Sequence, residues 1–249
     1  MRIGASIALI GAVISATVAC GGGAGLFRQY EYEEDMYLSL DGTATVYVNS
    51  SIAALNALRD TSFDASPTAR VDRDAVRDYF TTPVTHVTRA VTTSRRDNRQ
   101  FVHVRLDADD VRRLGETTPF AWSAYRFTKD GNLFVYRQTI GAPAGAQPPS
   151  AAWTGREIVA FRLHLPSKIW YHNAGEGNFR RGNILVWEQA LGDRLSGAPL
   201  VVEARMESES ILYRTLWLFA ATFVAVAVLF GLVIWWVFRR GAVPAPRPT

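Results

Sequence analysis

The sequence predicts an α+β protein: a mainly antiparallel β-sheet domain with about three short helices, followed by one C-terminal transmembrane helix. Three observations support this fold class. Short runs rich in Val, Thr, Tyr and Phe alternate between apolar and polar residues and are separated by turn residues, which is typical of antiparallel hairpins. Brief segments between these runs begin with helix-capping residues. A final apolar run, over 216–238, contains no charged residue.

Strands are predicted in hairpins along the chain. Asp41-Gly42 and Asp130-Gly131 are dipeptides that two-residue hairpin turns prefer. The charged segment 94–100 joins another pair of strands. The predicted strands cover 30–40, 43–50, 84–93, 101–107, 120–129, 132–140, 156–166, 183–191 and 200–210.

Three short helices are predicted from their N-terminal caps. A side-chain oxygen at the cap accepts a hydrogen bond from an otherwise unpaired N–H of the first turn. Ser50 or Ser51 is the predicted cap of 52–60, Asp72 of 73–80, and Asp107 of 108–116.

The chain opens with a segment typical of a secretory signal peptide. Arg2 precedes an uncharged run over 3–19, which is shorter than the roughly 20 residues of a spanning helix. Residues 17–20, Thr-Val-Ala-Cys, resemble the lipobox of bacterial lipoproteins. This resemblance implies cleavage after residue 19 and attachment of diacylglycerol to the thiol of Cys20. The alternative is an ordinary signal peptide with an incidental cysteine.

The apolar run over 216–238 is long enough to cross a hydrocarbon layer of about 30 Å. Trp217 lies near one end and Trp235-Trp236 near the other, where indole rings prefer the membrane interface. Arg239-Arg240 follows directly, and an excess of Arg marks the cytoplasmic flank of a span. We therefore expect the C-terminus in the cytoplasm and the central domain outside it.

Together these signals divide the chain into five parts. The predicted parts are a signal peptide (1–19), a lipidated cysteine with a Gly-rich tether (20–29), an extracytoplasmic α+β domain (30–210), a transmembrane helix (216–238) and a short cytoplasmic tail (239–249). The predicted location is the bacterial cytoplasmic membrane, with the main domain on its periplasmic or outer side.

The charge distribution argues against a nucleic-acid partner, although the isoelectric point is near 9.4. The cations outside the central domain are Arg2, Arg214, Arg239, Arg240 and Arg247, and every acidic residue lies inside it. Acidic and basic residues in the domain are therefore nearly balanced, whereas a nucleic-acid-binding domain carries a basic face.

A second resemblance lies in the last part of the domain. The segment 161–191 resembles the closing half of LppM-domain lipoproteins, which also combine a lipobox, an exported α+β domain and a terminal span. The elements that match are the strand and proline turn at 161–166, Asn173, and Val186-Trp187; Ser167 and Ala174 depart from the glycines usual there. The resemblance implies a surface or envelope lipoprotein and supplies no catalytic residues.

No catalytic or metal-binding pattern is recognised. The four histidines have no metal-ligand spacing, and the H-E-x-x-H and G-x-S-x-G patterns are absent. We therefore predict no catalytic residue, no metal and no cofactor. The acidic run over 31–35 is expected to be the solvated start of a strand, and Asp107, Asp109 and Asp110 are expected to stabilise a helix N-terminus.

Aromatic residues of the hairpin over 120–136 are one candidate binding group. Trp122, Tyr125 and Phe127 can line a pocket for a lipid or a glycan. The alternative is that they form an ordinary aromatic core.

Arginines in two loops are the other candidate group. Arg95, Arg96 and Arg99 lie in one loop, and Arg180 and Arg181 lie in another. If both loops face the membrane, these side chains can contact anionic headgroups. The alternative is that both loops are solvated turns.

The leading hypothesis for function is a non-enzymatic, membrane-anchored envelope lipoprotein. Its exported domain is expected to bind a lipid, a glycan or an envelope protein near the membrane. Two alternatives are an envelope hydrolase or transferase that uses carboxylates not identified by the sequence, and a structural subunit of a membrane complex.

Overall fold

The computed structural model describes residues 28–143, 153–175 and 182–241 of the chain. Over these residues the strands form two sheets, and both sheets contribute side chains to one hydrophobic core. The predicted α+β class is confirmed.

The larger sheet has seven strands. Their order is β10 (Ile184–Ala190), β8 (Glu157–His164), β1 (Gln29–Leu38), β2 (Ala44–Ser51), β5 (Arg99–Ala108) and β3 (Thr85–Val87), with β4 (Thr92–Arg96) also paired to β5. All pairs are antiparallel except β1 and β8, which run parallel with Tyr37 opposite His164. The sheet is therefore mainly antiparallel, as predicted.

The smaller sheet has four strands, all antiparallel. Their order is β6 (Ser123–Asp130), β7 (Leu133–Ile140), β11 (Leu200–Glu207) and β9 (Ile169–His172). Its inner side chains, such as Tyr136 and Met206, are buried in the core shared with the larger sheet.

The turns of two predicted hairpins lie at the dipeptides from which they were predicted. Gly42 adopts φ +92° between β1 and β2, a conformation that glycine takes without steric cost. Thr43 donates to the Asp41 carboxylate from its backbone N–H and its hydroxyl, at 2.9 and 2.8 Å. Gly131 has φ +60° between β6 and β7.

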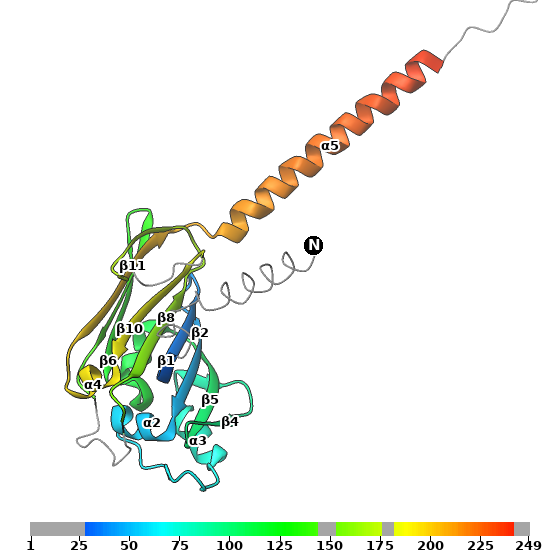
Figure 1. The fold of residues 1–249 in the computed structure, drawn as a ribbon. Coiled ribbons are helices and arrows are strands. Elements are labelled where there is room, and N and C mark those ends of the chain that lie inside the picture. The colour runs from blue at the N-terminus through cyan, green and yellow to red at the C-terminus, as the bar shows by residue number, and fades with distance from the viewer. Residues whose placement is uncertain (1–27, 144–152, 176–181, 242–249) are drawn as a thin grey trace, which may run out of the picture.

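Two of the three predicted helices are confirmed with their caps. The Ser51 hydroxyl accepts from the Ala54 N–H at 3.1 Å and begins α2 (Ile52–Arg59). The Asp72 carboxylate accepts from the N–H groups of Asp74 and Ala75 and begins α3 (Arg73–Phe80). Figure 1 shows both helices at the end of the domain opposite the long helix α5 (Ile211–Gly241).

The third predicted helix is wrong in its start and its type. Asp107 still belongs to β5, where it pairs with Thr45 of β2. The turn that follows is a 3₁₀ helix, η1 (Val111–Glu116), and its cap is Asp110, which accepts from the Arg112 N–H. Strand β5 stays paired with β2 as far as Ala108, so the helical turn begins later than the sequence predicts.

Other differences concern short elements. The predicted strand over 84–93 is divided into β3 and β4, which both pair with β5. Phe120 belongs to a second 3₁₀ turn, η2 (Thr118–Phe120), rather than to a strand. Strand β9 and the one-turn helix α4 (Leu191–Leu195) were not predicted from the sequence.

Helix α5 contains the predicted span and extends beyond both of its ends. The helix has 31 residues, and its most apolar window is not covered by any other described part of the chain. By length and composition it could cross a membrane. Figure 1 shows it projecting from the domain.

Candidate functional site

A buried ion pair lies between the two sheets. Glu34 points inward from β1, and Arg59 ends α2; the two side chains are 2% and 1% exposed. The Arg59 guanidinium donates to Glu34 Oε2 at 3.0 Å. Charged groups are rarely buried this completely unless they are paired and hydrogen-bonded.

Neutral donors complete the shell around the Glu34 carboxylate. Tyr32 donates to Oε2 at 3.0 Å, while Tyr125 and Gln138 donate to Oε1 at 3.2 and 3.0 Å. Tyr125 and Gln138 belong to the smaller sheet, so this carboxylate links the two sheets.

Burial shifts the titration of both partners towards their neutral forms. It raises the pKa of Glu34 to about 7, although hydrogen bonds from Gln138 and Tyr125 act in the opposite direction. It lowers the pKa of Arg59 to about 10, so Arg59 stays cationic at neutral pH.

Aromatic rings surround the Arg59 guanidinium. Its Cζ lies 4.0 Å from the ring centroid of Trp122, 4.9 Å from that of Tyr32 and 5.3 Å from that of Phe120. Arg59 also donates to the carbonyl of Pro119 and to the Tyr32 hydroxyl. Two residues proposed from the sequence, Trp122 and Tyr125, thus lie beside this ion pair.

Side chains fill the space around these aromatic residues. Trp122 and Phe127 are buried, and Phe127 stacks on Phe134 with their centroids 4.9 Å apart. The void lined in part by Glu34 and Tyr136 measures only about 10 Å³. A single water needs about that much space. Trp122 and Phe127 belong to the hydrophobic core, and Tyr125 packs against it.

The proposed arginine groups are not brought to the same place. Arg95 and Arg96 end β4 beside the start of β5, at the end of the strands away from α5. Arg96 donates to the Tyr30 carbonyl, and its guanidinium lies 4.5 Å from the Phe101 ring. Arg180, Arg181 and Cys20 lie outside the described residues.

The acidic run over 31–35 is not wholly solvated, contrary to expectation. Glu31 is buried and accepts from Arg99 at 2.6 Å, and Glu34 forms the pair described above. A shift in register beside Tyr30 and Tyr32 lets adjacent residues turn inward. The alternation of polar and apolar residues in the sequence does not reveal this shift in register.

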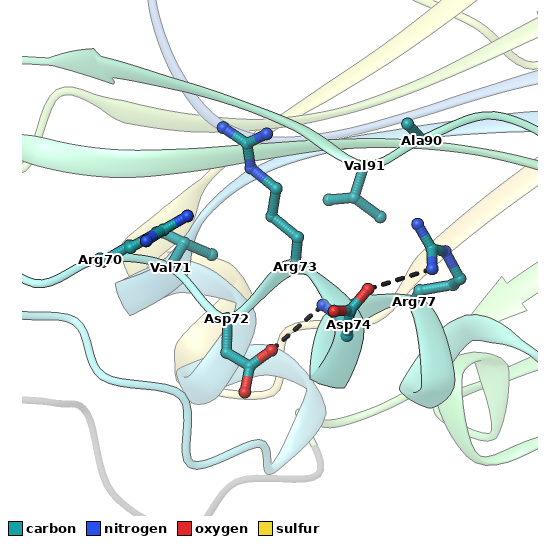
Figure 2. A pocket seen from close by; sticks show the side chains of 8 residues that line it. All are labelled: Arg70, Val71, Asp72, Arg73, Asp74, Arg77, Ala90 and Val91. Carbon is teal, nitrogen blue, oxygen red and sulfur yellow. Dashed lines mark hydrogen bonds and ion pairs between the residues drawn. The ribbon is translucent and has the colours of Figure 1, made fainter.

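A hollow of about 470 Å³ lies beside the N-terminus of α3 (Figure 2). Its charged lining consists of Arg70, Asp72, Arg73, Asp74 and Arg77. Asp72 caps the helix by accepting from the Asp74 N–H at 3.1 Å, and Asp74 pairs with Arg77 at 3.0 Å, as the dashed lines in Figure 2 show. The surplus positive charge thus comes from Arg70 and Arg73, at the end of the domain away from α5.

The histidines are separated and bonded to different partners. His86 and Asp109 are 3.2 Å apart, while His103 contacts Asn49 and Ser94. Within the ranges that the structure describes, no group of three or more His, Cys, Asp or Glu side chains is arranged to hold a metal ion.

The base of α5 is fastened to the domain by three segments, which we call the helix junction: Asn132, 166–168 and 207–211. Backbone N–H groups of Glu207, Ser208 and Ile211 donate to the carbonyls of Lys168, Asn132 and Pro166, at 3.0, 3.0 and 3.2 Å. The buried Ser167 hydroxyl donates to the Glu209 carbonyl at 2.8 Å. The junction therefore holds the β6–β7 turn and the segment before β9 against the start of the helix.

Two large aromatic side chains are exposed next to the helix junction. Trp170 and Tyr171 of β9 are 61% and 48% exposed. Neither was singled out by sequence analysis, because β9 has only four residues and no clear alternation.

Comparison with known proteins gives one structural likeness. The chain is similar to the folded domain of LppM from Mycobacterium tuberculosis. That NMR structure aligns with a TM-score of 0.40 and 12% sequence identity, covering 74% of this chain and 94% of that one. This LppM domain is of the same kind as the lipoproteins that segment 161–191 resembles in sequence. No family model matches the chain, and no curated protein is found that is similar to it in sequence.

Proposed function

We propose that the protein is a membrane-anchored bacterial envelope lipoprotein with a non-enzymatic, exported domain. The observation that supports this most is the uncovered apolar helix α5, which begins four residues after β11 ends and is fastened at the helix junction. A helix so apolar and so little covered is stable in hydrocarbon and poorly suited to water.

Two further signals support the proposed orientation and the second anchor. The signal-like start and the pair Arg239-Arg240 both favour an exported domain with a cytoplasmic C-terminus. Acyl chains on Cys20 would add a second attachment, as the lipobox resemblance implies.

The packed interior favours binding on the outer surface of the domain. Because Trp122 and Phe127 are buried in the hydrophobic core, a lipid, glycan or protein partner is more readily accommodated by exposed side chains. In this proposal the domain acts by binding, and its ionic core serves to hold the sheets together.

Membrane integration and topology test this proposal. The full chain with a C-terminal epitope tag is expected to stay in bacterial membranes after alkaline washing. Protease added to spheroplasts is expected to degrade the domain and spare the tag. Replacing Val226 and Leu229 in the middle of α5 by Arg is expected to release the chain, whereas replacing both by Ala leaves it embedded, because a charge is costly at the bilayer centre. Release of the unaltered chain, or cleavage of the tag from outside, would contradict the proposal.

A further inference from the structure

We infer that the outer face of the four-stranded sheet, next to the base of α5, binds the anionic headgroups of the membrane. The residues of this headgroup face are Arg126, Lys129, Arg137, Lys168, Trp170, Tyr171 and Arg205. The inference rests on the proposed function in one respect, that α5 spans a membrane.

Pairing between β9 and β11 sets the aromatic part of the headgroup face. Tyr171 lies opposite Arg205, whose guanidinium is 5.5 Å from the tyrosine ring. The Lys168 ammonium is 5.0 Å from the Trp170 ring. The neighbouring side chains Ile169 and Met206 point into the core, so the cations and rings are turned outward.

These rings suit the boundary between lipid and water. Indole and phenol rings are apolar with one polar end, and they concentrate at the headgroup level of membranes. Trp170 keeps its N–H satisfied by donating to Glu207 at 3.2 Å. Its exposed fraction of 61% leaves most of the ring available to a second surface.

The rest of the headgroup face has a surplus of positive charge. A shallow hollow of about 560 Å³ crosses β6, β7 and β11, and its charged lining consists of Arg126, Lys129, Asp130, Arg137, Glu203 and Arg205. Glu203 is shared between Arg137 at 3.7 Å and Arg205 at 3.3 Å. With Lys168 and Glu207 added, five cations face three carboxylates.

One cross-strand pair consists of two like charges, which is unfavourable for the folding of the domain without a bound anion. Arg126 of β6 lies directly opposite Arg137 of β7, and both side chains are exposed. Like charges in directly opposed positions destabilise a sheet. A phosphate group bound between them would relieve this repulsion.

The helix junction puts this face beside the membrane that α5 enters. Lys168 belongs to the junction, and Lys129 precedes the turn whose Asn132 is also part of it. Figure 1 shows β11 leading directly towards the base of α5. The bilayer is therefore the partner within reach of the face, and its phosphate groups match the surplus charge.

Headgroup quenching in reconstituted membranes tests the inference. The full chain carrying Cys20→Ala is given one fluorescent label, at Thr128→Cys in the hollow or at Asp78→Cys on α3 at the other end. It is placed in phosphatidylcholine vesicles, with or without phosphatidylglycerol, that carry a quencher on some headgroups. We expect at least twofold stronger quenching at position 128 than at 78. We also expect phosphatidylglycerol to increase it and 1 M salt to reduce it, because the screening length falls from about 10 Å at 0.1 M to about 3 Å at 1 M.

Matched variants separate the two parts of the headgroup face. Lys129→Glu with Arg205→Glu is expected to abolish the effect of phosphatidylglycerol, and Trp170→Ala with Tyr171→Ala is expected to weaken quenching in both kinds of vesicle. Arg73→Glu, on the distant hollow, serves as the control and leaves quenching unchanged. All five changed side chains are exposed, so the fold is retained.

Three results would overturn the inference. They are equal quenching at 128 and 78, no response to phosphatidylglycerol, and loss of quenching in inorganic phosphate at constant ionic strength, which would indicate a site for free phosphate. In each case the chain would still resist alkaline washing. Failure of the proposed function is different, since the chain would then be washed from the vesicles altogether.

Discussion

Glu34 and Arg59 show how a charged pair can be held inside a small sandwich of sheets. Four donors surround the carboxylate and three rings surround the guanidinium. Removing one member of a buried pair leaves an uncompensated charge, whereas removing both often does not destabilise a protein. We therefore expect the pair to contribute more to the alignment of the two sheets than to their net stability.

Arg59→Ala is expected to destabilise the domain by about 3–5 kcal/mol, because Glu34 would stay buried without its cation. Arg59→Met combined with Glu34→Gln is expected to recover most of this loss, since the amide still accepts from Tyr125. Chemical unfolding in detergent micelles measures both values. Equal losses in the single and double variants would show that the pair does not act as a unit.

The stability of the domain is expected to depend on the protonation of Glu34. Its pKa is raised from 4.5 to about 7 in the folded state, so the folded protein holds this proton more tightly than the unfolded chain. The resulting stabilisation is complete below about pH 4.5 and is lost as the pH rises through 7. The shift corresponds to about 3 kcal/mol.

Unfolding measured between pH 4.5 and 8 tests this dependence. Glu34→Gln is expected to flatten the curve over this range, whereas Asp78→Asn, which changes an exposed carboxylate of α3, should leave its slope unaltered. A slope that persists in Glu34→Gln would assign the dependence to another group.

Trp122 and Tyr125 were proposed from the sequence as a binding group, but the charges beside them were not. Aromatic residues in a predicted hairpin are visible as a cluster in the sequence. Glu34 lies in a run of acidic residues that looks solvated, and its partner Arg59 is brought to it only by the packing of α2. A long-range pair of this kind has no local signal.

At the scale of elements, the helices and turns that depend on contacts within a few residues could be predicted from the sequence. The caps Ser51 and Asp72 and the turns at Gly42 and Gly131 act within a few residues, and each is found where it was expected. The end of β5 depends instead on pairing with β2, and the start of the third helix was therefore misplaced. The strand β9 was missed because its four residues owe their conformation to β11.

Helix α3 is expected to depend strongly on its cap. It has eight residues and buries only Val76 and Phe80, so little packing replaces a lost hydrogen bond. Asp72→Ala should cost about 1 kcal/mol and speed amide hydrogen exchange in α3 more than in β2. Asp78→Ala, on the same helix but away from the cap, is the control; similar exchange in both variants would argue against the capping role.

At the scale of the whole molecule, the division into two sheets could not be read from the sequence. Hairpins were predicted individually, but the parallel pairing of β1 with β8 joins residues separated by more than half of the chain. That pairing brings the end of β8 and the segment 166–168 next to the end of β1. The position of α5 relative to the N-terminal strand is thus a property of the complete fold.

The same pairing fixes how two anchors would hold the domain. β1 begins at the end of the sandwich away from α5, and its ten residues extend about 33 Å towards it. A fully stretched tether from Cys20 to Arg28 reaches at most about 28 Å. With both acyl chains and α5 in one bilayer, the domain cannot stand upright on its helix. The domain would then have to tilt, with its strands inclined along the lipid surface and both of its ends held close to the bilayer.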